Sequence, residues 1–382
     1  MKRGWEIRKL SEVCSTITDG THQTPKYFDS GYIFLSSKNV KTGKIDWENV
    51  KYLDESQHVA LSKRLKPQLN DILLAKNGTT GVAALVDKVE VFDIYVSLAL
   101  LRPTSVINPR LLLYFINSPM AKSQFNKRLK GMGVPNLHLK EIREVQFPFP
   151  TKSTEQEEIV EVLDKAFAAI DQAKANIEQN IANAKELFQS KLNQIFSHKG
   201  DGWVEVALGE VCENLDSRRV PITKNKRIKG PIPYYGASGV VDHVEDYLFD
   251  EDLLLVSEDG ANLVARTYPI AFPISGKTWV NNHAHVLKFE EQTTQAFVEH
   301  YLNSIRLDDY ISGMAQPKLN QKKLKSIAIP MPRLSARAEA VRDILGLDGF
   351  TKNLLSYYQM KLASLEELKK SILQKAFAGE LT

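Results

Sequence analysis

The sequence of 382 residues contains only two cysteines, Cys14 and Cys212, and no CxxC pair. A disulfide framework and a cysteine-based zinc site are therefore excluded. The chain also lacks any run near the ~18 apolar residues of a membrane span, and no apolar stretch follows the basic residues at its start. We expect a cytoplasmic protein with no membrane segment.

The net charge is small, +4, but it is unevenly distributed. Residues 1–154 hold 23 Lys and Arg against 14 Asp and Glu, a net charge of +9, whereas residues 199–333 hold 16 against 18. A polyanion such as DNA is the partner that this first segment favours, with an ordinary basic surface as the plainer alternative. The length predicts two or three domains, and the 43% of apolar residues is typical of globular proteins.

An internal repeat is visible in the sequence. Gly4, Trp5, Leu10 and residues 12–14 (EVC) recur 198 residues later as Gly202, Trp203, Leu208 and residues 210–212 (EVC). Gly131, Met132, Pro135, Leu137, Lys140, Pro148 and Pro150 recur 182 residues later as Gly313, Met314, Pro317, Leu319, Lys322, Pro330 and Pro332. Both cysteines occupy the same repeat position, which indicates small core residues and not nucleophiles.

Each copy begins with a module of short apolar runs separated by Gly, Pro and aromatic residues, a pattern typical of an α+β globule. Each ends in a long helical stretch with apolar residues at steps of three and four. We predict an α+β fold with two similar globular domains, residues 1–150 and 200–333, separated by two long antiparallel helices, residues 151–199 and 334–382. About 45 residues of helix span about 65 Å, so the helices would act as spacers.

Three local features bear on these helices. Residues 151–199 contain neither Pro nor Gly, and Ser153 with Gln156 could form a capping box at the start. In the second helix Gly346 and Gly349 suggest a kink or break. Arg337-Ala338 stands where the repeat would place Glu155-Gln156, so the capping arrangement could differ there.

Basic and polar residues gather in the loops of both modules, where they could neutralise phosphates and approach a nucleic acid closely. In the second module six basic residues lie within positions 218–229 without an acid, ahead of residues 234–239 (YYGASG). The predicted DNA-binding residues are Thr21, His22, Thr24, Lys26, Lys76, Asn77, Thr79, Thr80 and Lys130 in the first module, and Arg218, Arg219, Lys224, Lys226, Arg227, Lys229, Tyr235, Ser238, Lys277 and Asn281 in the second.

Several motifs in order resemble the specificity subunits of type I restriction-modification systems. In the first module they are residues 17–22 (ITDGTH), 71–76 (DILLAK), 78–81 (GTTG) and 148–150 (PFP) with Glu155-Gln156; in the second they are 234–239 (YYGASG), 257–262 (SEDGAN) and 281–285 (NNHAH). The resemblance covers the whole chain, including the repeat layout.

This resemblance implies two target-recognition domains, each reading one half of a split sequence in double-stranded DNA, with the helices as a ruler. It also implies a pseudo-twofold arrangement that docks two methyltransferase subunits, and restriction subunits in the full complex. The chain itself would be non-catalytic and hold no cofactor, while S-adenosylmethionine, ATP and Mg would be bound by the partners.

A self-sufficient nuclease or methyltransferase is the second hypothesis, but its motifs are missing. Residues 275–278 (SGKT) look like the end of a phosphate-binding loop, yet Ala271 stands where its first glycine belongs. The sequence shows no Asn/Asp-Pro-Pro-aromatic motif and no glycine-rich loop suited to S-adenosylmethionine. His283 and His285 alternate and could share a metal if both lay on one strand face, although ordinary strand residues are the plainer interpretation. A coiled-coil scaffold that binds protein is the third hypothesis, which the basic loops disfavour.

Overall fold

The computed structural model describes residues 2–41, 43–129, 136–197, 202–313 and 316–381. The chain forms two compact units. Unit 1 comprises Met1–Ile177 and Met360–Thr382, and unit 2 comprises Glu178–Gln359. Each unit therefore contains one module together with part of both long helices, α6 (Ser153–Ser197) and α11 (Leu334–Ala378).

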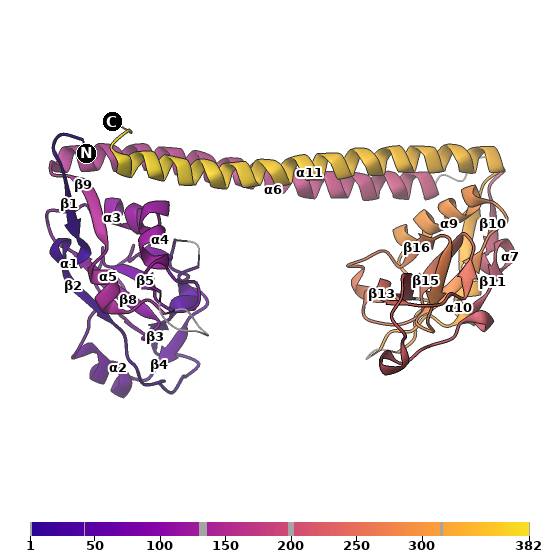
Figure 1. The fold of residues 1–382 in the computed structure, drawn as a ribbon, viewed down its shortest axis with the longest axis horizontal. Helices are drawn as coiled ribbons and strands as arrows, with labels where there is room; N and C mark the ends of the chain where they lie inside the picture. The colour runs from indigo at the N-terminus through magenta and orange to yellow at the C-terminus, as the bar shows by residue number, and fades with distance from the viewer. Residues whose placement is uncertain (1, 42, 130–135, 198–201, 314–315, 382) are drawn as a thin grey trace. The chain divides into compact units, whose positions relative to one another are not determined.

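Unit 1 combines nine strands with five short helices among the residues described (Figure 1). The strands are β1 (Trp5–Lys9), β2 (Cys14–Asp19), β3 (Tyr32–Leu35), β4 (Lys51–Leu53), β5 (Ile72–Ala75), β6 (Ala83–Leu85), β7 (Phe92–Ile94), β8 (Leu98–Pro103) and β9 (Gln146–Pro150). The helices are α1 (Leu10–Val13), α2 (Glu55–Ser62), α3 (Pro109–Ile116), α4 (Pro119–Asn126) and α5 (Leu139–Arg143).

The core of unit 1 is organised around β5, which lies inside the antiparallel sheet β2-β8-β5-β6. All four of its side chains are buried, because both faces of this sheet are covered. Ile72 and Leu74 join a cluster that contains α3, α4 and the long helices, while Leu73 and Ala75 face a second cluster that contains β3 and β7. Alternate strand residues point to opposite faces, so an uninterrupted apolar run is what this position requires.

Unit 2 repeats this plan. Its described strands are β10 (Val204–Ala207), β11 (Glu213–Asn214), β12 (Ile232–Gly236), β13 (Gly239–Val244), β14 (Phe249–Asp250), β15 (Leu253–Ser257), β16 (Ala271–Ile274), β17 (Lys277–Val280), β18 (Ala284–Lys288) and β19 (Ala328–Met331). Its short helices are α7 (Leu208–Val211), α8 (Asn262–Ala265), α9 (Gln292–Ser304) and α10 (Gln321–Lys325). The sheet β11-β18-β15-β16 again places a buried strand, β15, inside.

Hydrogen bonds at equivalent positions relate the two units in detail. β1 pairs with β9 as β10 pairs with β19. The Asn117 side chain exchanges two hydrogen bonds with the backbone of Ala83, and Asn303 makes the same two bonds to Ala271. The internal repeat in the sequence is therefore a repeat of the fold.

Helices α6 and α11 pack against each other through their apolar stripes. In unit 1, Phe167 and Ile170 of α6 share a cluster with Phe377 of α11. Lys174 of α6 forms an ion pair with Glu366, whereas Phe167, earlier in α6, lies under Lys369, so the helices run antiparallel. In unit 2 the same packing joins Leu192 and Phe196 to Val341 and Ile344. The predicted fold class, two α+β domains with two long packed helices, is confirmed.

Two local predictions were wrong. Helix α11 is continuous through Gly346 and Gly349, because Ile344 and Thr351 remain buried on either side and offset the ~1 kcal/mol that each glycine costs. No capping box forms between Ser153 and Gln156. Instead the Gln156 side chain, 1% exposed, donates to the carbonyls of Pro150 and Val106 and accepts from the N–H of Asn108.

Arg337 takes over this role at the start of α11. Its Nε donates to the carbonyl of Pro332, the repeat counterpart of Pro150, and its Nη1 donates to Thr294 Oγ1 of α9. Ala338 stands in the place of Gln156, so the neighbouring Arg337 makes the bond to the proline carbonyl that the glutamine makes in unit 1. Among the described residues, no helix is long and apolar enough to span a bilayer.

Candidate nucleic-acid interface

Three loops of unit 1 meet at one end of its central sheet, where β2 and β5 end and β8 begins. The backbone of Thr21 bonds to Ile94 and Val96, just before β8, and Lys76 N–H donates to the carbonyl of Ser97. The carbonyl of Lys76 in turn accepts from Leu137 N–H. Neighbouring antiparallel strands begin and end at the same edge of a sheet, so the loops at that edge meet. Segments far apart in the sequence thus form one polar surface.

Most of the residues predicted in unit 1 lie on this surface. His22, Thr24, Lys26 and Thr79 are exposed, and Thr21, Asn77 and Thr80 are partly exposed. Thr24 Oγ1 lies 3.3 Å from the hydroxyl of Tyr95. Lys130 lies outside the described residues.

Lys76 differs from the others, because its side chain is only 7% exposed and points inward. Its Nζ donates to Asp19 Oδ2 at 2.6 Å, and Arg64 Nη2 donates to Asp19 Oδ1 at 3.1 Å. Burial alone would raise the pKa of the Asp19 carboxyl, but Lys76, His22 and Arg64 together hold this pKa below its usual value. Lys76 therefore ties the end of β5 to the end of β2.

The same loops converge in unit 2. Leu215 N–H donates to the carbonyl of Val286, Glu258 N–H to that of His283, and Leu319 N–H to that of Glu258. The last bond matches the one between Leu137 and Lys76 in unit 1, so Glu258 is the structural counterpart of Lys76. The two modules therefore have equivalent sheet ends, with a lysine in unit 1 and a glutamate in unit 2 at the same position.

The residues predicted in unit 2 fall into three groups. Lys224, Lys226, Lys229, Ser238 and Lys277 are exposed; Arg218, Arg219 and Arg227 are paired with acids; and Tyr235 and Asn281 contribute to the sheet end. Among the residues described, no ion pair engages Lys224, Lys226 or Lys229. Lys277 Nζ lies 4.7 Å from the ring centroid of Tyr247.

The paired arginines of unit 2 hold the long loop after β11 in place. Arg227 donates to Asp242 at 2.9 Å and stacks over Tyr234, with 4.3 Å from its Cζ to the ring centroid. Arg218 donates to Glu251, also at 2.9 Å. Asn281 is 7% exposed; its Oδ1 accepts from the N–H of His283 and forms a turn.

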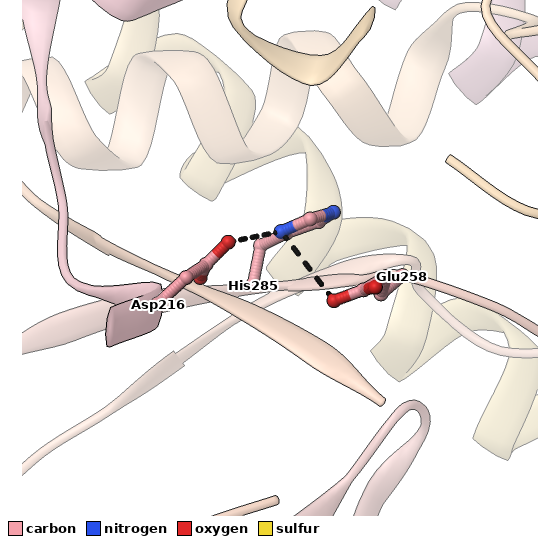
Figure 2. A group of neighbouring side chains, drawn as sticks. All are labelled: Asp216, Glu258 and His285. Carbon is pink, nitrogen blue, oxygen red and sulfur yellow. Dashed lines mark hydrogen bonds and ion pairs between the residues drawn. The ribbon is translucent and has the colours of Figure 1, made fainter. Parts of the chain in front are cut away.

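A buried charge network lies beneath this loop, formed by Asp216, Glu258, His285 and Arg219, and Figure 2 shows the first three. His285, 1% exposed, places Nδ1 2.6 Å from Asp216 Oδ2 and Nε2 2.8 Å from the carbonyl of Leu319. Arg219 Nη1 donates to Glu258 Oε2 at 2.7 Å. Burial would raise the pKa of Asp216, but His285, the N–H of Val286 and Arg219 hold it below its usual value.

The donor set of Asp216, Glu258 and His285 could in principle hold a metal ion, since their ligand atoms lie within 4.8 Å of one another. However, Arg219 already pairs with both carboxylates, and Lys318 also pairs with Glu258. A divalent ion would add two further charges to a largely buried site, which is costly. His283 precedes β18 and pairs with Asp259 at 2.9 Å, so the two histidines do not share a strand face. The arrangement is that of an ion network that fixes the loops.

Two other sequence features also have structural roles. Residues 275 and 276 form the turn between β16 and β17, and residues 277 and 278 begin β17, where a phosphate-binding loop would begin a helix. Cys14 is buried and Cys212 half-buried, and burial raises the pKa of each thiol to about 12. Both cysteines are unreactive packing residues, as the repeat predicted.

Sequence reasoning missed the acids that hold the interface together. Asp19 is the last residue of β2 and Asp216 lies two residues after the end of β11, and Glu258 and His285 complete the network in unit 2. A signal was present, because the repeat aligns Lys76 with Glu258 and so pairs opposite charges at one position.

Comparison with known proteins agrees with this architecture. Residues 2–183 and 200–370 match the family described as "Type I restriction modification DNA specificity domain". The StySPI specificity subunit of Salmonella potsdam is 22% identical over 100% of this chain and 90% of its own length, and the EcoKI specificity subunit of Escherichia coli K12 is equally similar. A type I specificity subunit from Haemophilus influenzae is 33% identical, but the match spans 43% of this chain and about half, 47%, of that protein.

Two solved structures share the fold over the whole chain, each at 18% identity. A chain from a structure on assembly and conformational transition of the type I R-M system has a TM-score of 0.79 and is covered to 99%. The crystal structure of the HsdS subunit from Thermoanaerobacter tengcongensis has a TM-score of 0.61 and is covered to 98%. The chain belongs to the type I restriction-modification DNA specificity family, which is non-catalytic.

Proposed function

We propose that unit 1 and unit 2 each read one half of a bipartite target in double-stranded DNA, within a complex whose chemistry belongs to other subunits. The observation that carries this proposal is the duplication of one polar sheet end on equivalent scaffolds, with loops of different sequence in the two copies. Equivalent scaffolds with different loops are suited to reading two different half-sites. The domain limits 1–150, 151–199, 200–333 and 334–382 remain part of this proposal.

Exposed loop residues make the DNA contacts in this proposal. Lys26, Lys224, Lys226, Lys229 and Lys277 meet phosphates, while polar side chains reach base edges in the major groove. The polar set is Thr21, His22, Thr24, Asn77, Thr79 and Thr80 in unit 1 and Tyr235 and Ser238 in unit 2. Asn281, which is 7% exposed and accepts from the N–H of His283, holds the turn between them and the sheet in this proposal. Lys130 remains a phosphate contact proposed from the sequence. Lys76, Arg219, Arg218 and Arg227 position the loops, and their own contacts with DNA would first require their ion pairs to open.

The long helices set the distance between half-sites and dock two methyltransferase subunits. Supporting this, α11 exposes the large apolar side chains of Leu345, Phe350, Tyr357, Met360 and Leu368, which neither domain core buries. Restriction subunits complete the assembly, and S-adenosylmethionine, ATP and Mg are bound by the partners. The complex acts in the cytoplasm, where the DNA is.

Co-expression of the chain with its methyltransferase partner, followed by methylation sequencing of the host DNA, tests the function. We expect a split adenine-methylated motif that appears only when both chains are present. A chain without the partner should transfer no methyl group from labelled S-adenosylmethionine to DNA. Absence of both a motif and a stable complex would favour a protein-binding scaffold instead.

A further inference from the structure

A lysine-lined hollow lies on unit 1 between α4 and α11, apart from the loops described above. It measures about 570 Å³, and its lining consists of Asn117, Pro119, Lys122, Ser123, Asn126, Lys127 and Lys370. We refer to it as the lysine hollow. The buried ion networks do not involve it.

Its positive charge is available to a ligand. Lys122 and Lys127 are exposed, and no hydrogen bond or ion pair engages their side chains among the described residues. Lys370 pairs at 2.6 Å with Glu367 on the same helix, but both side chains are more than half exposed, at 59% and 70%. An exposed pair of this kind contributes little stability, so an incoming anion can replace it.

The scaffold holds the lysines in place. Ala121 and Phe125 anchor α4 in the core, and Ser118 caps its start by accepting from Ala121 N–H. Phe125 also lies directly under the turn between β5 and β6, 3.4 Å from where a Cβ on Gly81 would be. The lysine hollow is thus joined by packing to the turn that carries Thr79 and Thr80.

The described part of unit 2 has no matching helix. Asn117 and Asn303 occupy equivalent positions, but α4 follows Asn117, whereas no helix is described between α9 and α10, where Asp308 lies. Asp309 follows, and Arg306 is paired with Asp308 at 2.7 Å. This local difference agrees with the net charges of +9 for residues 1–154 and −2 for residues 199–333.

We propose that the lysine hollow is a sequence-independent anchor for DNA phosphates, which adds salt-dependent affinity to unit 1 beyond that of its recognition loops. This rests on the proposed DNA-reading function. Lysine is a mobile point charge that binds phosphate without selecting a base, and the short Ser123 and Asn126 side chains leave room for the backbone to approach.

The test compares the full chain with K122Q/K127Q on a 30-base-pair duplex of unrelated sequence. Each lost phosphate contact lowers the slope of log K against log salt by about 0.9, so the double variant should lose about 1.8. The matched control is K152Q/K165Q, which removes two exposed charges of the same unit outside the hollow and should keep the wild-type slope. Unchanged thermal midpoints would show that all variants are folded.

If K122Q/K127Q keeps the wild-type slope of log K against log salt, the proposal of a phosphate anchor is wrong. A loss confined to a duplex carrying the target sequence would contradict it as well, since the lysines would then read bases. The proposed function is judged separately, because a wild-type complex that methylates no defined motif contradicts DNA reading whatever the slope on unrelated DNA.

Discussion

Lys76 and Glu258 occupy one position of the repeated fold with opposite charges, and each unit compensates in its own way. In unit 1, Lys76 neutralises Asp19 directly. In unit 2, Glu258 adds a second acid beside Asp216; Arg219 pairs with both acids, Lys318 pairs with Glu258, and His285 lies within hydrogen-bond distance of Asp216. When loop sequences differ between two copies of one scaffold, the buried acids beneath the loops must therefore still be paired with basic residues.

Replacing Lys76 by methionine should destabilise unit 1 by about 3 kcal/mol, because it leaves the buried Asp19 carboxylate without its closest partner. Urea unfolding would measure the loss. The double variant D19N/K76M removes both charges and should recover part of it. K26M, which alters an exposed lysine, should unfold like the wild type; an equal loss there would show that charge removal in general is the cause.

Glu299 on α9 gives unit 2 a pH dependence. Burial and the nearby Asp348 raise its pKa to about 7. Because the pKa of this carboxyl is higher in the folded chain than in the unfolded chain, the folded chain holds the proton more tightly. The contribution of Glu299 to stability is therefore fully present below about pH 4.5 and is lost as the pH rises to about 7. E299Q should thus raise the thermal midpoint at pH 8 by a few degrees and change it little at pH 5. A midpoint gain that is the same at both pH values would contradict this.

At the scale of elements, the long helices are held by aromatic residues that enter the domain cores. Phe377 of α11 is 2% exposed and contacts Phe115 and Phe147, so F377A should cost about 3–5 kcal/mol through lost contacts and a cavity. Phe350 on the same helix is 66% exposed, and F350A should change the free energy of unfolding by less than about 0.5 kcal/mol. Chemical denaturation of the two variants decides whether α11 is anchored as described.

The elements also show where sequence reasoning succeeds. The repeat and the apolar stripes predicted both modules and both helices, because periodicity follows directly from which side chains must be buried. The contact between Lys76 and Asp19 could not be predicted, since 57 residues separate them and the order β2-β8-β5-β6 decides which loops meet. The break predicted at Gly346 does not form, because the ~1 kcal/mol that a glycine costs in a helix is smaller than the free energy gained by burying Ile344 nearby.

At the scale of the whole molecule, the division into two units falls inside both long helices, after Ile177 in α6 and before Met360 in α11. Apolar side chains bind the two helices together in each unit, so a change of length in one helix alone would misalign its stripe with the other. A test of the ruler must therefore lengthen both helices together.

Inserting one helical turn of four residues after Asn176 in α6, and four more before Lys361 in α11, adds about 6 Å to each helix. If the helices set the distance between half-sites, the spacer in the methylated motif should lengthen by one to about two base pairs, since B-DNA rises about 3.4 Å per base pair. Both half-site sequences should stay the same, because no loop has changed. Methylation sequencing of cells that express the lengthened chain with its partner measures the spacer and the half-sites together. A motif with the original spacer would exclude the helices as the ruler, and altered half-sites would show that the insertion had disturbed the domains themselves.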